Sequence, residues 1–290
     1  MCSSILPPSK TGLSVPVACG QCMECRLAYS REWAIRMTHE RQMHERSCFL
    51  TLTYSDENLP RFGQLIKKDL QDFFKRLRHV TGPFRYVACG EYGDLRRRPH
   101  FHVAMFGQDF SADRIESGEG VKGHKLYVSP TLSRVWARGE LLQQTIGSLD
   151  FESCAYIARY ITKRIGGVGA SPLPLACDPD TGELVMPNPE FLIMSRKPMI
   201  GHSWMKKHFY TDAFVHGRVI TEQGTPAPIP TAYKRKLTAA DRLRLSAVIG
   251  KNMAPALEKQ RLEDTPERRA ARSFYAKARV TAFARDVKGS

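Results

Sequence analysis

Two β-strands joined as a hairpin are the feature that most constrains how this chain can fold. The run Arg98–Phe106 places apolar residues around His100 and His102, and its alternation predicts a strand. Side chains at positions i and i+2 of a strand point to the same face, so the two imidazoles are expected side by side. An earlier strand is predicted at Phe84–Glu91, and the polar, glycine-containing segment Tyr92–Pro99 between the two is typical of a hairpin loop.

A carboxylate is expected to join these imidazoles. If the hairpin closes around its loop, Glu91 lies roughly opposite His100, and both converge with His102. Imidazole nitrogens and carboxylate oxygens bind divalent cations, so these three residues form a candidate metal site. The alternative is a half-buried strand whose histidines merely face solvent, and the hairpin alone leaves that alternative open.

The elements around the hairpin predict an α+β fold. Cys48–Tyr54 is rich in aromatic and β-branched residues and predicts a strand. Lys67–Val80 predicts an amphipathic helix, because its apolar residues recur at the spacing of one helix face (Leu70, Phe73, Phe74 and Leu77). The order strand, helix, strand, strand predicts a split β-α-β unit on an antiparallel β-sheet flanked by helices. Further along, residues 125–128 and 141–149 favour strands, and residues 130–138 favour a helix.

The net charge of the chain indicates a polyanionic partner. Its 290 residues carry a formal charge of +15, with 44 Lys and Arg against 29 Asp and Glu. Such an excess favours nucleic acid over an anionic membrane surface. No apolar run approaches the roughly 18 residues of a transmembrane helix, and the first residues lack a signal-peptide pattern. We therefore expect a cytosolic protein with no membrane partner.

Cysteines near the N-terminus predict a second metal site. Cys19, Cys22 and Cys25 form a C-x2-C-x2-C knuckle, and Cys2 is available upstream as a fourth ligand. A turn with this spacing directs thiolates at one ion, and four sulfurs suit a tetrahedral structural zinc. The alternative is a loop of reduced thiols, because the knuckle has no clean second pair of cysteines.

Basic segments lie on both sides of the predicted sheet. A helix is predicted from residue 26 to residue 46, where most basic residues form a solvated face and His39 and His44 lie at the surface. The segments Met194–Gly201 and Trp204–Tyr210 combine aromatic and basic side chains. This composition fits base stacking and phosphate binding in a single-stranded channel, and it equally fits packing of the aromatic rings against the sheet.

A helix with two tyrosines supplies the remaining candidate chemistry. Asp150 is a suitable N-cap for a helix over 151–163, which two glycines then end. Tyr156, Tyr160 and Lys163 occupy positions i, i+4 and i+7, so they share one helix face. Tyrosines at this spacing are commonly core residues with hydrogen-bonded hydroxyls. Beside a divalent cation, a phenol is instead a candidate nucleophile toward a phosphodiester, and the lysine charge stabilises its phenolate.

These stretches together resemble the motifs of HUH endonucleases. The histidine pair with its central phenylalanine matches their histidine–hydrophobic–histidine motif. Phe49–Tyr54 looks like their first motif, and Tyr156–Lys163 is similar to their Tyr-x3-Tyr-x2-Lys motif. The order and spacing resemble the rolling-circle replication initiators of small single-stranded DNA phages, the microviruses. The cysteine knuckle, the run Arg98–His102 and the segment Met194–Gly201 are similar to the gokushovirus branch, and the resemblance spans about residues 1–235.

The resemblance implies a role for each matched residue. The two histidines with Glu91 would be metal ligands, and the family implies Mg²⁺ or Mn²⁺, although two nitrogens and one oxygen also admit Fe²⁺ or Zn²⁺. Tyr156 and Tyr160 would be the two nucleophiles, one to start a round of replication and the other to release and circularise the unit strand. Lys163 would be a charge-stabilising auxiliary. The product would be a 5′-phosphotyrosyl link with a free 3′-hydroxyl.

The function expected from the sequence is a replication initiation endonuclease that nicks one DNA strand at the origin and rejoins the ends. Residues 1–47 would hold the knuckle and a helix, residues 48–235 the nuclease domain, and residues 236–290 a basic helical tail with 13 Lys and Arg against 6 Asp and Glu. The expected partners in the host cytoplasm are single-stranded DNA, the origin, a host polymerase and, since the chain has no Walker A motif, a host helicase. The alternatives are a related HUH transposase or plasmid relaxase, and a zinc-dependent DNA-binding protein without catalysis.

Overall fold

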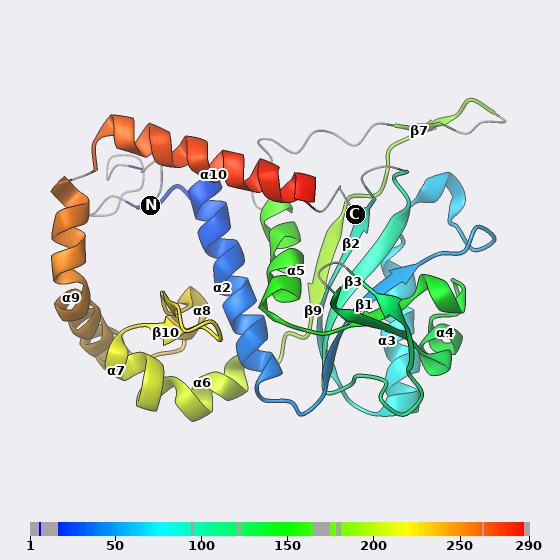
Figure 1. The fold of residues 1–290 in the computed structure, drawn as a ribbon, viewed down its shortest axis with the longest axis horizontal. Coiled ribbons are helices and arrows are strands. Elements are labelled where there is room, and N and C mark those ends of the chain that lie inside the picture. The colour runs from blue at the N-terminus through cyan, green and yellow to red at the C-terminus, as the bar shows by residue number, and fades with distance from the viewer. Residues whose placement is uncertain are drawn as a thin grey trace. The chain divides into compact units, whose positions relative to one another are not determined.

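The chain folds into two compact units. A computed structural model describes residues 6, 17–93, 96–120, 123–164, 175–177, 181–262 and 264–286. One unit comprises residues 36–202, and the other combines residues 1–35 with residues 203–290 (Figure 1). The domain boundaries predicted at 47 and 235 stay predictions.

A seven-stranded sheet forms the centre of the unit 36–202. Its strands lie in the order β4-β5-β6-β1-β3-β2-β9, and every neighbouring pair is antiparallel. The strands are β1 (Ser47–Thr53), β2 (Arg85–Tyr92), β3 (Pro99–Phe106), β4 (Ile115–Glu119), β5 (Lys125–Val128), β6 (Thr145–Gly147) and β9 (Phe191–Met194). The other elements are η1 (Arg61–Gly63), α3 (Lys67–Thr81), α4 (Pro130–Trp136), η3 (Leu141–Gln143), α5 (Phe151–Arg164) and the hairpin of β7 (Ala176–Cys177) and β8 (Leu184–Val185). The predicted α+β class, an antiparallel sheet flanked by helices, is confirmed.

The order of the central strands is that of a split β-α-β unit. β3 lies between β1 and β2 and is antiparallel to both, and α3 connects β1 to β2. The hairpin register pairs Glu91 with His100, as the sequence predicts, and β1 pairs Thr51 with His102. β9 was not predicted, and it extends the sheet by pairing with β2.

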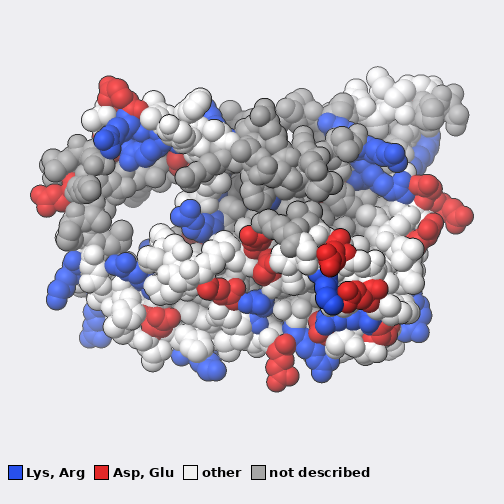
Figure 2. Space-filling view, viewed as in Figure 1, with Lys and Arg blue, Asp and Glu red and all other residues white. Residues whose placement is uncertain are grey.

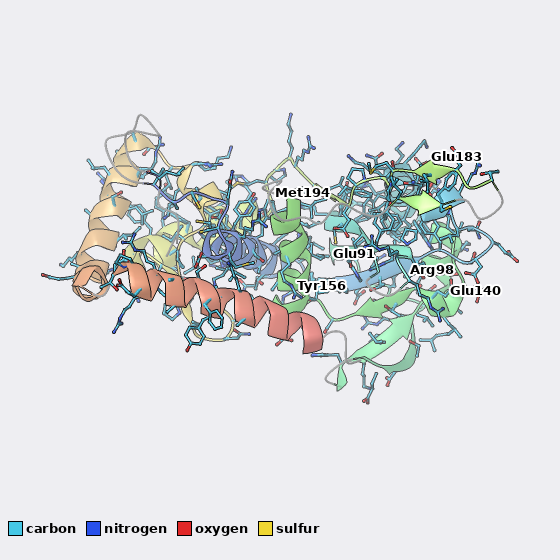
Figure 3. All side chains as sticks on the ribbon, turned by 90° about the horizontal axis from the view of Figure 1, so that it is seen from above. Glu91, Arg98, Glu140, Tyr156, Glu183 and Met194 are labelled. Carbon is cyan, nitrogen blue, oxygen red and sulfur yellow. The ribbon has the colours of Figure 1, made fainter. Side chains whose placement is uncertain are left out.

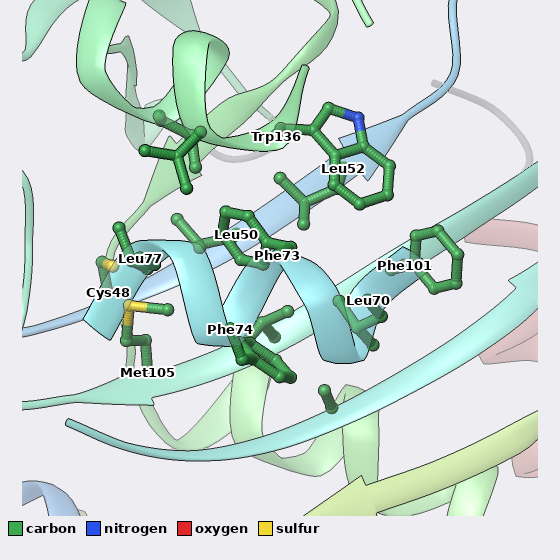
Figure 4. Close-up of a cluster of buried hydrophobic side chains, with 14 of the residues drawn as sticks. Cys48, Leu50, Leu52, Leu70, Phe73, Phe74, Leu77, Phe101, Met105 and Trp136 are labelled. Atoms are coloured by element: carbon green, nitrogen blue, oxygen red, sulfur yellow. The ribbon is translucent and has the colours of Figure 1, made fainter. Parts of the chain in front are cut away.

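The main hydrophobic core lies on the sheet face that α3 and α4 cover (Figure 4). Alternate residues of β1 and β3 enter it fully buried (Leu50, Leu52, Phe101, Val103 and Met105). α3 adds its predicted apolar stripe, and α4 adds Trp136. Side chains alternate along a strand, so the burial of Phe101 and Val103 on this face directs His100 and His102 to the opposite face.

Helix α5 covers that opposite face, where it packs on β2, β3 and β9 (Figure 1). Asp150 is its N-cap as predicted, because the carboxylate accepts a 2.8 Å hydrogen bond from the backbone N–H of Ser153. Cys154, Ile157 and Ala158 form the buried side of the helix. This packing fixes the helix over the strands that carry the two histidines.

The other unit is mainly helical. It holds the first part of α2 (Met23–Arg41), α6 (His202–His208) from its second residue, the π-helical turn Phe209–Ala213, α7 (Phe214–His216), the hairpin of β10 (Val219–Ile220) and β11 (Pro226–Ala227), α8 (Thr231–Lys234), α9 (Ala239–Leu262) and α10 (Pro266–Asp286). Trp204 and Phe209 are buried beside Tyr233, with ring centroids 6.2 and 6.5 Å from the tyrosine ring. Both rings therefore pack in a core. Within the described part of the chain, no helix is long and apolar enough to cross a membrane.

The last turns of α2 carry buried polar residues. The helix ends at Arg41, earlier than residue 46, and Arg36, His39 and Glu40 are only 7%, 4% and 2% exposed. The prediction of a solvated face is wrong for these residues, and so is the surface position of His39.

A segment that follows β9 accounts for the burial of two of these side chains. Nε of Arg36 donates a 3.2 Å hydrogen bond to the carbonyl of Ile200, and the carboxylate of Glu40 accepts a 2.6 Å hydrogen bond from the N–H of Gly201. Nε of Arg85 on β2 lies 2.6 Å from the other oxygen of Glu40. The run Met194–Gly201 thus contributes structural contacts to the unit that carries the sheet.

Replacing Glu40 with Gln is expected to lower the free energy of unfolding by about 3 kcal/mol at pH 7, because a buried guanidinium loses its partner. Burial opposes the carboxylate charge, but hydrogen bonds from His44 and Gly201 and the charge of Arg85 lower the pKa of Glu40 below its usual 4.5. A group with a lowered folded-state pKa stabilises the fold above its unfolded-state pKa, and this contribution is lost as pH falls through the folded value. Urea titrations should therefore show the full difference between wild type and Glu40→Gln at pH 7 and a smaller difference below pH 4.5.

Asp72→Asn is the matched control for that experiment. Asp72 on α3 also pairs with a cation, Lys68, but both side chains reach solvent. Solvent screens such a pair, so this variant should unfold at nearly the wild-type urea concentration. Equal losses in Glu40→Gln and Asp72→Asn would show that the buried Glu40 contacts contribute nothing specific.

Candidate active site

Three ligand groups meet on the sheet face beneath α5. Oε1 of Glu91 lies 2.9 Å from Nε2 of His100 and 2.9 Å from Nε2 of His102. The hairpin register sets Glu91 directly opposite His100, and the two-residue period of β3 brings His102 to the same face. We call these three residues the Glu-His-His cluster. The structure thus brings together all three residues that the sequence proposed as metal ligands, and their role as ligands stays a prediction.

Each imidazole of the cluster is oriented through its other ring nitrogen. Nδ1 of His100 lies 3.1 Å from the carbonyl oxygen of Arg98, and Nδ1 of His102 lies 3.1 Å from Oγ1 of Thr51. The ring of Phe49 stacks on His102 at a centroid distance of 5.3 Å. Contacts of this kind hold the tautomer and the ring direction of metal-binding histidines. Sequence reasoning missed Thr51 and Phe49 as site residues, because only the pairing of β1 with β3 places them there.

The electrostatics of the cluster favour an ionised carboxylate. Burial opposes the charge of Glu91, but hydrogen bonds from the two histidines outweigh it and lower the pKa of Glu91 to about 2. At His102 burial prevails over the effect of Glu91 and lowers the pKa. At His100 burial acts in the same direction, but the hydrogen bond to Glu91 and its charge prevail and raise the pKa. An anionic carboxylate beside a neutral imidazole is the protonation state that metal coordination requires.

Tyr156 of α5 completes this constellation. Its hydroxyl donates a 2.9 Å hydrogen bond to Oε1 of Glu91 and lies 3.4 Å from Nε2 of His102. Figure 3 shows Tyr156 and Glu91 close together between α5 and the strands. Burial, and then the negative charge of Glu91, raise the pKa of Tyr156 well above its usual 10. The phenol therefore stays protonated unless positive charge is added at the cluster.

Arg159 supplies one positive charge near this phenol. Its guanidinium carbon lies 5.2 Å from the centroid of the Tyr156 ring, and its charge acts in the direction of lowering the pKa of that tyrosine. Burial lowers the pKa of Arg159 itself. Sequence reasoning missed this residue, although its i+3 spacing from Tyr156 on a predicted helix was a usable signal.

The donor set and the spacing of the Glu-His-His cluster fit a small divalent cation. Its ligand atoms all lie within 4.8 Å of one another. In an octahedral site with metal–ligand distances near 2.1 Å, adjacent ligand atoms lie about 3 Å apart. The 2.9 Å between Oε1 and each Nε2 agrees with that spacing. Two imidazoles and a carboxylate leave further coordination positions for water or a phosphate oxygen, as a catalytic site requires.

Residues 47–165 match the family model of the replication-associated protein ORF2. "Replication-associated protein VP4" of Bdellovibrio phage phiMH2K is 33% identical over 236 residues, which cover 78% of this chain and 69% of that relative. The chain belongs to this family of replication-associated proteins. The matched residues run from β1 to the end of α5, so the family model includes the Glu-His-His cluster and Tyr156.

Two further members of the family are similar over a shorter range. "Replication-associated protein ORF2" of Spiroplasma virus 4 is 36% identical over 162 residues, covering 52% of this chain and 49% of the relative. "Replication-associated protein ORF4" of Chlamydia phage 1 is 31% identical over 162 residues, covering 52% of this chain and 39% of the relative. These relatives are phage proteins of the microvirus type, so the resemblance to microvirus replication proteins is confirmed. No solved structure matches the chain significantly.

Two residues of the family's tyrosine motif lie on α5 beyond Tyr156. Tyr160 and Lys163 belong to the helical backbone, which bears out the predicted helical spacing, but their side chains lie outside the described residues. The geometry of the site therefore concerns Tyr156, and the roles of Tyr160 and Lys163 stay predictions.

The cysteine knuckle lies outside the segment that the family model matches. Sγ atoms of Cys19, Cys22 and Cys25 lie within 4.8 Å of one another at the start of α2. Sγ of Cys19 accepts hydrogen bonds from the N–H groups of Gln21 (3.4 Å) and Cys22 (3.2 Å). Backbone donors to sulfur favour a thiolate, the form that binds metal. Cys2, the predicted fourth ligand, lies outside the described residues.

Proposed function

We propose that this protein nicks one DNA strand at a replication origin, with Tyr156 as the attacking residue and the Glu-His-His cluster as a divalent-metal site. The observation that carries the proposal is the position of the Tyr156 hydroxyl, 2.9 Å from Oε1 of Glu91 and 3.4 Å from Nε2 of His102. The relatives are named replication-associated proteins of phages, which supports replication over transposition or plasmid transfer. The excess of positive charge on the chain supports a DNA substrate.

The proposed step is a transesterification. The phenolic oxygen of Tyr156 attacks the phosphorus, the bond from phosphorus to the 3′ oxygen breaks, and that oxygen leaves and takes up a proton. The 5′ phosphate is then esterified to Tyr156, and the other fragment ends in a free 3′-hydroxyl. One phosphate ester replaces another, so attack by a 3′-hydroxyl on the phosphotyrosine rejoins the strand by the reverse path.

The residues of the site divide the work of this step. The carboxylate of Glu91 holds the hydroxyl proton of Tyr156 in the resting site, and Arg159 adds positive charge that favours the phenolate. A bound Mg²⁺ or Mn²⁺ would neutralise charge on the carboxylate and on the phosphate oxygens. Tyr160 is proposed as the second nucleophile and Lys163 as an auxiliary cation, as the sequence motif implies. A host helicase and a host polymerase are the proposed partners of the nicked strand.

Single strands that tile the genome encoding this chain provide the test. Each strand is labelled at its 3′ end or its 5′ end, incubated with Mn²⁺ and run on denaturing gels. We expect one strand to yield a 3′ label that migrates with the protein and a 5′-labelled fragment that a polymerase extends. Fragments free of protein with both labels would indicate hydrolysis by water and contradict attack by tyrosine. Binding without any cleavage would favour a non-catalytic DNA-binding protein.

We also propose that Cys19, Cys22 and Cys25 hold a structural zinc ion, with Cys2 as the fourth ligand. Purified protein should then contain about one zinc per chain, and Cys22→Ser should lose most of it, because the remaining ligands bind weakly. Elemental analysis after dialysis measures this, and Cys177→Ser serves as the control that keeps its zinc. A wild-type protein free of zinc after expression in zinc-supplemented medium would contradict the proposal.

A further inference from the structure

We propose that a pocket at the turn of the β2–β3 hairpin binds a nucleotide of the single-stranded DNA beside the cleaved phosphate. The pocket has a volume of about 380 Å³ and is lined by Arg96, Arg97 and Arg98 together with Phe62 and Tyr92. This volume lies within the range of ligand-binding sites. The assignment rests on the proposed function, because strand transfer at the Glu-His-His cluster is what brings a single strand to this place.

The charge of the pocket suits a phosphate group. The described residues that line it include three arginines and no carboxylate. Arg98 is held in place, because its guanidinium donates 2.6 Å hydrogen bonds to Asp56 and to the carbonyl of Tyr54. Arg96 and Arg97 are exposed. Figure 2 shows basic side chains gathered at the end of the sheet where β2 and β3 join.

An aromatic wall suits a base. Phe62 is half-buried in η1 and adopts a left-handed backbone conformation, with φ 60° and ψ 17°. Arg97 across the pocket is also left-handed, with φ 50°. Bulky residues rarely adopt this conformation, and the strain persists only where the surrounding structure imposes it, as at ligand sites. A ring held at the pocket wall offers a stacking surface that any base accepts.

The pocket lies next to the proposed cleavage site. Tyr92 and Pro99, which line it, pair across the hairpin and directly adjoin Glu91 and His100. Successive side chains of a strand point to opposite faces, so the pocket and the Glu-His-His cluster occupy opposite sides of the same two strand ends. The hairpin turn joins the two sites physically, since the Arg98 carbonyl that orients His100 belongs to a residue of the pocket wall. A strand that crosses the sheet end therefore reaches both.

These features favour a single strand over a duplex. A base inside a duplex is stacked and paired, so it must be extruded before it can enter a concave pocket. An unpaired base meets no such barrier, and arginines beside a ring are the usual means of binding one nucleotide without reading its sequence.

Binding of fluorescein-labelled dT15 in EDTA tests the pocket without cleavage. Each lost phosphate contact lowers the slope of log K against log salt by about 0.7. Arg96→Ala with Arg97→Ala should therefore reduce the slope by about 1.4 and weaken binding about 25-fold at 0.1 M salt. Lys75→Ala with Arg134→Ala removes the same charge from α3 and α4, outside the pocket lining, and should change the affinity by less than about threefold.

Phe62→Leu separates stacking from charge. This change keeps an apolar side chain but removes the ring, so the dissociation constant for dT15 should rise about tenfold with the salt slope unchanged. Duplex binding should change much less in both pocket variants. Circular dichroism and Mn²⁺ binding equal to wild type would show that the variants are folded.

The pocket assignment and the proposed function fail in different ways. If the double arginine variant bound dT15 as the control does while wild type still formed the covalent product, the pocket assignment would be wrong and the function would stand. If pocket variants lost dT15 binding but wild type formed no covalent product on any strand, the pocket would stand and the function would fall. Equal losses for dT15 and duplex would overturn the preference for a single strand.

Discussion

The Tyr156→Phe variant is expected to form the covalent protein–DNA product at least about 10⁴-fold more slowly than wild type, because it lacks the oxygen that bonds to phosphorus. In the structure this oxygen is the group of α5 that lies within 3.4 Å of both Glu91 and His102. The measurement is the amount of 3′ label that migrates with the protein over time. Binding of the strand in EDTA should remain within a few-fold of wild type, since the ring is retained.

Two further tyrosine variants decide how specific that loss is. Tyr127→Phe removes a hydroxyl from β5, away from the cluster, and should react at the wild-type rate. Tyr160→Phe should still form the first covalent product if Tyr156 initiates, and should fail to release a closed circle if the two tyrosines alternate. Full activity of Tyr156→Phe with loss of activity in Tyr160→Phe would assign initiation to the other tyrosine.

Loss of a cluster ligand is expected to abolish metal binding and strand cleavage together. Glu91→Gln keeps the size of the side chain but removes the charge that faces both imidazoles, and His102→Ala removes one nitrogen donor. Changes to groups that only support metal ligands cost about 10- to 100-fold in metal affinity, so loss of a ligand should raise the Mn²⁺ dissociation constant at least about 100-fold. Electron paramagnetic resonance of free Mn²⁺ measures this without DNA.

Matched variants show whether the effect belongs to the cluster. Thr51→Val removes the hydroxyl beside Nδ1 of His102 and should weaken Mn²⁺ binding about tenfold, in line with an orienting role. His79→Ala removes an imidazole from the last turn of α3 and should leave Mn²⁺ binding unchanged. An unaltered Mn²⁺ affinity in Glu91→Gln would show that the cluster is not the metal site.

Much of the fold follows from local sequence patterns. The apolar stripe of α3 and the alternation of β3 have the periods of a helix and a strand, and each is recognisable in a short window. The hairpin register also follows locally, because a loop of fixed length sets which residues face each other. This explains why the pairing of Glu91 with His100 could be predicted.

Burial of polar residues could not be predicted in the same way. Arg36, His39 and Glu40 have the composition of a solvated helix face, yet they are buried. Two of them bond to Ile200 and Gly201, some 160 residues away along the chain. No local period encodes such a contact, because a buried charge is tolerated only where a distant partner satisfies it.

The sequence by itself determined the α+β class, the strand that carries His100 and His102, and the helix that carries Tyr156, since each depends on a period within one segment. Only the tertiary structure brought Tyr156 to Glu91, set Thr51 and Phe49 against His102, and placed arginines beside Phe62 at the hairpin turn. These contacts join residues from separate strands, helices and loops. Their formation depends on how the sheet is ordered and which helix covers each face, and neither property is written in any one segment.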